Sequence, residues 1–268
     1  MPAFPAHSRT LGCTILGSGS KGNAAVIHGP EGNLLLDAGF SAKELLCRLE
    51  RVHVDPCSLR AILITHDHSD HTSACRVISG RLGIPAYFTP ETAEGLARCS
   101  GRCPVEKYLI MPGSPLDLCG IRVEPFTVSH DTPAVAFTFT ACEHKIGFAT
   151  DLGFISNLVK TKLSGCDLLV LESNYDPARL RASARPITLK RRIAGRQGHL
   201  GNPDAMEALA ELLSPNTRSV VFAHLSQECN DPGLVAELAE SRLAELRRQD
   251  ISFHIASQFE PLETLWLE

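Results

Sequence analysis

The sequence predicts a single α/β domain in which two β-sheets pack face to face between outer helices, an αββα four-layer sandwich. Short β-rich segments alternate with helical segments through both halves of the chain, and no stretch rich in proline, glycine or serine separates the halves. The length of 268 residues and the hydrophobic content of 44% are sufficient for one large core.

The ends of this domain and its expected location follow from composition. Residues 1–10 are expected to form a disordered extension, and residues 11–268 the folded domain. No apolar run reaches the roughly eighteen residues that span a bilayer, and no apolar signal core begins the chain, so no membrane partner and a cytoplasmic location are expected. The ten cysteines are scattered, so most are expected to be small buried side chains rather than disulfides.

The secondary-structure elements are predicted from local patterns. The first half contains expected strands over 13–16, 24–28, 33–37 and 61–65. Ser41-Ala42-Lys43-Glu44 is a capping box for a helix through about Arg51, and Thr89-Pro90 begins another helix. The second half contains expected strands over 121–128, 134–140, 145–150, 167–172 and 219–223, with a turn at 142–144 and helices over 202–213 and 232–248.

A glycine-rich segment near the N-terminus invites a different interpretation. Gly17-Ser18-Gly19-Ser20-Lys21-Gly22 matches the G-x-G-x-x-G pattern of dinucleotide-binding folds, and Asp37 stands where a ribose-binding acid would be expected. That function requires a helix that starts at the glycines and binds pyrophosphate at its N-terminus. Residues 23–28 are instead short and β-branched, and 29–33 lead into the next strand. A hairpin is therefore predicted, and the dinucleotide site is rejected.

Ligand-type side chains are concentrated directly after the strand over 61–65, in His66-Asp67-His68-Ser69-Asp70-His71. A loop between a strand end and a helix start can direct several side chains into one cleft. Imidazole and carboxylate groups suit zinc, manganese or iron, but two ions need more ligands than this loop supplies. A lone histidine or aspartate at a strand end is more often structural. Here three such residues follow later strands: His130, Asp151 and His224.

Together these ligand-type residues resemble the signature of the metallo-β-lactamase superfamily over nearly the whole chain. The resemblance implies the metallo-β-lactamase fold and two divalent metal ions, zinc or manganese. One ion would be held by His66, His68 and His130, the other by Asp70, His71 and His224, with Asp151 bridging them. The apolar segment that ends at Asp37 resembles the family's first motif, whose aspartate orients the metal loop. His7, His28, His53, His144 and His254 are expected to be structural or solvated.

The distribution of charge bears on the substrate, because this superfamily cleaves β-lactams, thioesters, lactones and phosphodiesters. Residues 178–203 contain no acid, while the rest of the chain holds 19 basic against 30 acidic residues. This basic block is a footprint for a polyanion, although a solvated helical face would look the same. Its seven basic residues are Arg179, Arg181, Arg185, Lys190, Arg191, Arg192 and Arg196.

Further motifs resemble nucleases of the superfamily. Gly198-His199-Leu200 resembles their phosphate-contacting histidine, and Glu172 their acidic motif, but the short interval between them leaves no room for the inserted domain of the RNase J group. The chain resembles the small WalJ/YycJ subgroup of 5′→3′ exodeoxyribonucleases more closely than it resembles the RNase J group. It departs from that subgroup at Gly201 and Cys229, where Ser and Asn are expected. The resemblance to this subgroup is carried by residues 17–23, 130–131, 150–153, 189–193, 198–202 and 224–230.

The resemblance implies a two-metal phosphodiester hydrolase that acts on nucleic acid, with DNA as the expected substrate and a metal-bridging hydroxide as nucleophile. Asp70 and His199 are the expected catalytic residues: Asp70 holds the water together with Asp151, and His199 contacts the scissile phosphate. Two alternatives stay open. One is a small-molecule metallohydrolase for a cyclic phosphodiester, thioester or lactone, and the other is a regulatory protein that retains the fold.

Overall fold

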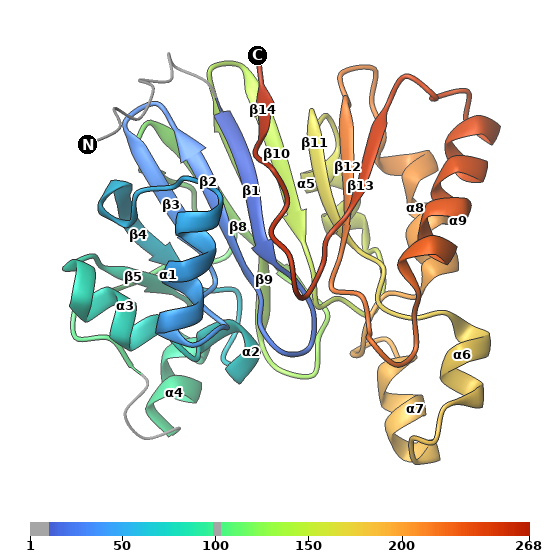
Figure 1. The fold of residues 1–268 in the computed structure, drawn as a ribbon, viewed down its shortest axis with the longest axis horizontal. Coiled ribbons are helices and arrows are strands. Elements are labelled where there is room, and N and C mark those ends of the chain that lie inside the picture. The colour runs from blue at the N-terminus through green and yellow to red at the C-terminus, as the bar shows by residue number, and fades with distance from the viewer. Residues whose placement is uncertain (1–10, 99–102) are drawn as a thin grey trace.

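The computed structural model describes residues 11–98 and 103–268, so the predicted extension over 1–10 lies outside the described residues. Two seven-stranded mixed sheets form the centre of the molecule (Figure 1). The first has the order β14-β1-β2-β3-β4-β5-β6 and the second the order β13-β12-β11-β10-β9-β8-β7. The strands of the first sheet are β1 (Leu11–Gly17), β2 (Ala24–Gly29), β3 (Gly32–Leu36), β4 (Leu59–Leu63), β5 (Ala86–Phe88), β6 (Lys107–Leu109) and β14 (Leu265–Leu267). Those of the second are β7 (Leu116–Leu118), β8 (Ile121–Val128), β9 (Ala134–Ala141), β10 (His144–Ala149), β11 (Leu168–Glu172), β12 (Ser219–Ala223) and β13 (Ser252–Ile255).

Helices cover the outer face of each sheet (Figure 1). Buried side chains of α1, α3 and α4 pack on the first sheet, and those of α5, α8 and α9 pack on the second. The short helices α2, α6 and α7 lie at the lower end of the sheets in the view of Figure 1. The helices are α1 (Ala42–Arg51), α2 (Ser69–Thr72), α3 (Cys75–Leu82), α4 (Pro90–Arg98), α5 (Asn157–Leu163), α6 (Pro177–Ala182), α7 (Ile187–Ile193), α8 (Asn202–Leu212) and α9 (Pro232–Glu245), with a 3₁₀ turn at Pro56–Ser58. No described helix is long and apolar enough to cross a membrane.

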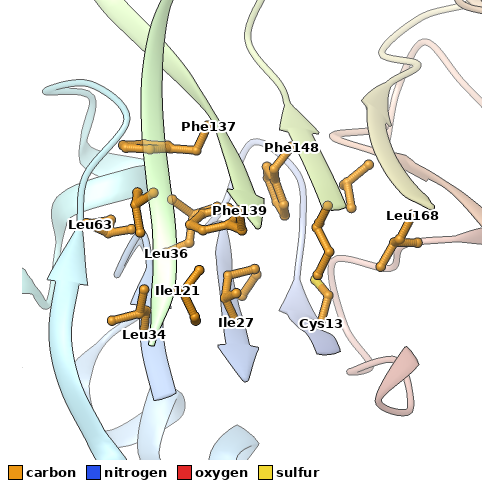
Figure 2. Close-up of a cluster of buried hydrophobic side chains, with 14 of the residues drawn as sticks. Cys13, Ile27, Leu34, Leu36, Leu63, Ile121, Phe137, Phe139, Phe148 and Leu168 are labelled. Atoms are coloured by element: carbon orange, nitrogen blue, oxygen red, sulfur yellow. The ribbon is translucent and has the colours of Figure 1, made fainter. Parts of the chain in front are cut away.

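The central core lies between the two sheets. Figure 2 shows Leu34 and Leu36 of the first sheet opposite Phe137 and Phe139 of the second, all of them fully or almost fully buried. Alternate residues of the same strands, such as Leu35 and Ala136, belong to the clusters under the outer helices. Both faces of these strands are therefore buried, as a four-layer sandwich requires. The predicted αββα architecture is confirmed.

Most predicted elements are present with small shifts at their ends. The Ser41 hydroxyl accepts a hydrogen bond from Glu44 N, as the capping box predicts. Cys142 and Glu143 have φ angles of 52° and 67°, the left-handed backbone of a tight hairpin turn between β9 and β10. The glycine-rich segment enters strand β2 rather than a helix, and β2 pairs antiparallel with β3, which confirms the hairpin.

Two expectations need correction. The strands β5, β6, β7, β13 and β14, each of three or four residues, were not predicted, because runs this short carry too few residues to show a period. Among the described residues only Cys13, Cys75, Cys166 and Cys229 are buried cysteines, whereas Cys47, Cys57 and Cys142 are exposed. Five of the nine described cysteines are therefore not core side chains.

Candidate metal centre

Several strands end at the same edge of the sandwich, and this edge carries the candidate site. Strands β10, β11 and β12 are parallel, and β8 runs in the same direction as β10 because both are antiparallel to β9. In the first sheet β3 and β4 are also parallel. Residues that follow these strands thus meet at one end of the two sheets. They are Asp37, His66, His130, Asp151 and His224.

The loop over 66–71 is held in place by Asn23, which follows the glycine-rich segment, and by Ala38 and Gly39, which follow β3. Asn23 N donates to Asp70 O at 2.7 Å, and Ala38 N donates to His71 O at 2.7 Å. Gly39 leaves no room for a side chain, since a Cβ atom there would lie 1.6 Å from Asp70 O. Asn23 and Gly39 therefore hold the metal loop in place. Helix α2 begins at Ser69, so Asp70 and His71 lie on its first turn and not ahead of the helix as predicted.

The structure brings all seven predicted ligands together. The candidate ligand atoms of His66, His68 and His130 lie within 4.8 Å of one another, and so do those of Asp70, His71 and His224. Asp151 lies between the two sets: its Oδ2 is 3.3 Å from His71 Nε2 and its Oδ1 is 3.9 Å from His130 Nε2. Neither His144 nor His254 belongs to a metal-type cluster of described residues, and nor do His28 and His53.

Polar atoms without partners test whether this cluster suits metal ions. His130 Nε2, Asp151 Oδ2 and His224 Nε2 are buried and form no hydrogen bond within the described chain. The opposite nitrogen of each imidazole is occupied: His130 Nδ1 lies 3.1 Å from Gly198 O, and His224 Nδ1 lies 2.8 Å from Glu172 Oε1. Buried polar atoms are normally paired, and metal-binding histidines normally donate their other N–H to an acceptor. The residues therefore fit divalent ions.

Asp37 contacts the metal loop, as the resemblance to the family's first motif implies. Its Oδ1 accepts from Thr65 N at 2.9 Å, and its Oδ2 lies 2.7 Å from His71 Nδ1. Burial lowers the pKa of His71, but Asp37 and Asp151 outweigh burial and raise that pKa to about 9. Asp37, Asp151 and His224 all have φ angles of 57–58°. Left-handed backbone is unfavourable for residues other than glycine and is concentrated at functional sites.

Glu172 has a larger part in the site than the sequence indicated. This fully buried carboxylate places Oε1 2.8 Å from Nδ1 of His199 and 2.8 Å from Nδ1 of His224, while its Oε2 accepts from Leu152 N and Leu200 N. Burial lowers the pKa of His199, and Glu172 more than reverses that effect, so the net shift is upward. His199 stands beside Asp151, with Nδ1 3.7 Å from Asp151 Oδ1.

The basic block is not one uniform surface. Arg179 and Arg185 pair with Asp231 and Glu228, at 3.6 Å and 2.9 Å, so their charges are balanced nearby. The other end of the block forms an open cleft beside His130, which we call the arginine cleft. Its lining includes Ser129, Asp131, Phe154, Arg191, Arg192 and Arg196.

Asp131 links this cleft to the metal centre. Its Oδ1 lies 3.3 Å from His68 Nε2 and 3.3 Å from His130 Nε2, and its Oδ2 is bonded to Arg192. His68 Nδ1, in turn, lies 3.1 Å from His66 Nε2. Asp131 therefore lies beside the outer nitrogen of His68, while Nδ1 faces the other candidate ligands.

Comparison with known proteins places this site in a family. The sequence profile described as "Beta-lactamase superfamily domain" matches residues 32–225, which include every candidate metal ligand. The chain belongs to the metallo-β-lactamase superfamily. The exodeoxyribonuclease YycJ of Bacillus anthracis is 31% identical over 253 residues, covering 94% of this chain and 94% of that protein. The exodeoxyribonuclease WalJ of Streptococcus pneumoniae is 32% identical over 236 residues, covering 87% of this chain and 88% of that protein.

Solved structures agree on the fold of this superfamily member. The metallo-β-lactamase fold protein YhfI from Bacillus subtilis superposes with a TM-score of 0.73 at 15% identity, covering 96% of this chain and all of that one. The predicted resemblance to the WalJ/YycJ subgroup is thus confirmed, and the protein is a metal-dependent hydrolase.

Proposed function

We propose that this metallo-β-lactamase-fold protein is a two-metal phosphodiester hydrolase that acts on DNA, as a cytoplasmic 5′→3′ exodeoxyribonuclease. The observation that carries the proposal is the convergence of two complete ligand sets around Asp151, directly beside the arginine cleft. The relatives that cover most of the chain are named exodeoxyribonucleases, which supports DNA as the substrate. Arginine side chains suit phosphate because they donate in a planar, bidentate fashion.

The ligand sets assign a role to each group of residues. Two divalent ions bound here, zinc or manganese, would bring the pKa of a shared water toward neutrality and polarise the phosphodiester. Asp70 Oδ2 lies 3.7 Å from His71 Nε2 and 3.8 Å from His224 Nε2, and Asp151 Oδ2 lies 3.3 Å from the same His71 Nε2. With the ions bound, the two carboxylates would hold the shared water, and either would accept a proton from it.

His199 is the residue that we expect to contact the scissile phosphate. Glu172 holds its Nδ1, so Nε2 stays available to the substrate. The raised pKa of His199 favours the charged imidazolium, which donates a hydrogen bond to an anionic phosphate oxygen more strongly than neutral imidazole does. The side chain is 23% exposed, in contrast to the fully buried Glu172. A substrate can therefore reach His199.

Cleavage of end-labelled single- and double-stranded DNA and RNA, with manganese, zinc or a chelator, tests the proposal. We expect DNA cleavage that requires metal and releases nucleotides from the 5′ end. Failure on every nucleic acid with every metal would contradict it. A small-molecule metallohydrolase would instead cleave a thioester, lactone or cyclic phosphodiester at a rate insensitive to salt, because it needs few phosphate contacts.

His199→Ala separates the proposed role of His199 from a merely structural one. We expect DNA cleavage to fall about 10²–10³-fold, as for loss of one transition-state donor, with the metal content unchanged. His144→Ala is the matched control, since His144 starts β10 and pairs with Asp167 outside the metal clusters. Unchanged cleavage by metal-loaded His199→Ala would show that His199 does not contact the scissile phosphate.

A further inference from the structure

The arginine cleft has the charge and position of a second phosphate site. It has a volume of about 710 Å³, and its lining contains Arg191, Arg192 and Arg196 against Asp131 as the one acid among the lining residues. The remaining formal charge is therefore +2. An internal phosphodiester carries one negative charge, whereas a terminal phosphomonoester carries about −1.5 to −2 near pH 7. The cleft matches the terminal group better.

The cleft is joined to the metal centre by short contacts. Ser129 Oγ donates to Arg196 O at 2.8 Å, and Gly153 N donates to Ser129 O at 2.8 Å. Ser129 is followed directly by the candidate ligand His130, and Gly153 lies two residues after Asp151. The cleft is thus joined to the segments that carry the candidate ligands His130 and Asp151.

Two of the three arginines are already fixed in the structure. The Arg196 guanidinium lies 3.8 Å from the centre of the Phe154 ring, and Arg192 is bonded to Asp131. A fixed guanidinium loses less entropy when it binds phosphate. The other basic residues lie outside this lining, and Arg179 and Arg185 are balanced by their acids. Three of the seven basic side chains of the block therefore line the arginine cleft.

We propose that the arginine cleft binds the phosphomonoester at the end of a DNA strand, so that the enzyme recognises phosphorylated termini. The inference rests on the proposed function and extends it, because it gives a physical reason for cleavage to start at an end. The chemistry recognised is the dianionic terminal phosphate, and either a 5′- or a 3′-phosphate could supply it.

Oligonucleotides that differ only at their ends test this inference. We would compare kcat/KM for the same single-stranded DNA with a 5′-phosphate, a 3′-phosphate or hydroxyl groups at both ends. A phosphate at one end is expected to raise kcat/KM about ten-fold, the contribution of a charged hydrogen-bonded group. Equal kcat/KM on all three substrates would overturn the inference while leaving DNA hydrolysis intact.

Variants then locate the effect. Arg191→Ala and Arg196→Ala are expected to bring the preference for the phosphorylated end to within about two-fold, and Arg191→Lys to restore part of it. Arg185→Ala removes the same charge outside the cleft and is expected to keep the full preference. A preference unchanged in both cleft variants would overturn the assignment.

A binding measurement separates this inference from the proposed function. The metal-loaded protein is titrated with the three oligonucleotides, and affinity for the phosphorylated end is expected to exceed affinity for the hydroxyl end about ten-fold. If no DNA is cleaved but this preference exists and depends on Arg191, the proposed function is wrong and the cleft assignment stands. If binding does not distinguish the ends, the cleft assignment is wrong.

Discussion

Glu172 Oε1 lies 2.8 Å from His199 Nδ1 and the same distance from His224 Nδ1, so one carboxylate oxygen orients both a candidate ligand and the proposed phosphate contact. Replacing Glu172 by Gln keeps the size but removes the charge and one acceptor position. We expect kcat to fall about 10–100-fold, as for loss of a group that orients metal ligands. Steady-state cleavage with parallel metal analysis measures this effect.

The pH profile distinguishes this role from simple packing. The pKa of His199 is raised, so its charged form is lost only as the pH rises through that elevated pKa. Without the Glu172 charge the pKa drops, and the alkaline loss of activity should move to lower pH. Glu211→Gln, an exposed change at the Lys160 pair, is the control and should leave the profile in place. A profile unchanged in Glu172→Gln would mean that Glu172 only packs.

Proton release on metal binding follows from the site's charges. Burial opposes protonation of His71 and His224, but Asp37 and Asp151 raise the pKa of His71 to about 9, and Asp151, Asp70 and Glu172 raise that of His224 well above its ordinary value. Both imidazoles are therefore charged at neutral pH without metal, and an ion must displace their protons. Calorimetry in buffers of different ionisation enthalpy should show roughly two protons released per loaded chain near pH 7.5.

This release has a defined direction with pH. A histidine with a raised pKa stabilises the metal-free fold below its ordinary pKa and loses that contribution as the pH rises through about 9. Proton release should therefore decline above that pH while metal affinity stops rising. Asp37→Asn should reduce the release, because the charge beside His71 is gone. A heat of metal binding that is the same in every buffer would contradict the charged state of His71 and His224 in the metal-free protein.

How far the sequence could predict this site depends on how local each signal is. The ligands His66 to His71 lie in one short segment, and Asp151 and His224 each follow a strand, so both patterns are visible along the chain. The shared contact of Glu172 with His199 and His224 joins residues 27 and 52 positions away, and no local pattern encodes such a distance. The motif around Glu172 could be found by resemblance to nucleases, but the contacts of Glu172 with His199 and His224 could not be predicted from the sequence.

The basic block shows the same limit for charge. Counting residues along 178–203 gave seven positive charges and no acid. The acids that balance them come from distant segments, as Arg185 and Glu228 are 43 positions apart and Arg192 and Asp131 are 61 apart. The folded structure is needed to distinguish the arginine cleft from Arg179 and Arg185, which pair with acids outside it. Fold class was easier, because near-continuous hydrophobic runs, as in β11 and β12, indicate strands that are buried on both faces.

Gly39 and Gly80 form a matched pair for the close packing behind the metal loop. A Cβ atom at Gly39 would lie 1.6 Å from Asp70 O, whereas one at Gly80 in α3 has nothing within 4 Å. Gly39→Ala should lower the free energy of unfolding by about 1–3 kcal/mol or more and weaken metal binding. Gly80→Ala should raise the free energy of unfolding by about 0.4–1 kcal/mol and leave metal binding unchanged. Denaturant unfolding with and without chelator checks both, and a tolerated alanine at 39 would mean that the loop is not held there.

The metal content of the purified, metal-loaded chain tests the central claim most directly. Elemental analysis of the wild-type protein should give two divalent ions per chain, because the two ligand sets are both complete around Asp151. His68→Ala, which affects only the set of His66, His68 and His130, should leave close to one. Two ions in the wild type and one in His68→Ala would support a dinuclear centre. A wild-type content of one ion or fewer after loading, in folded protein, would contradict it.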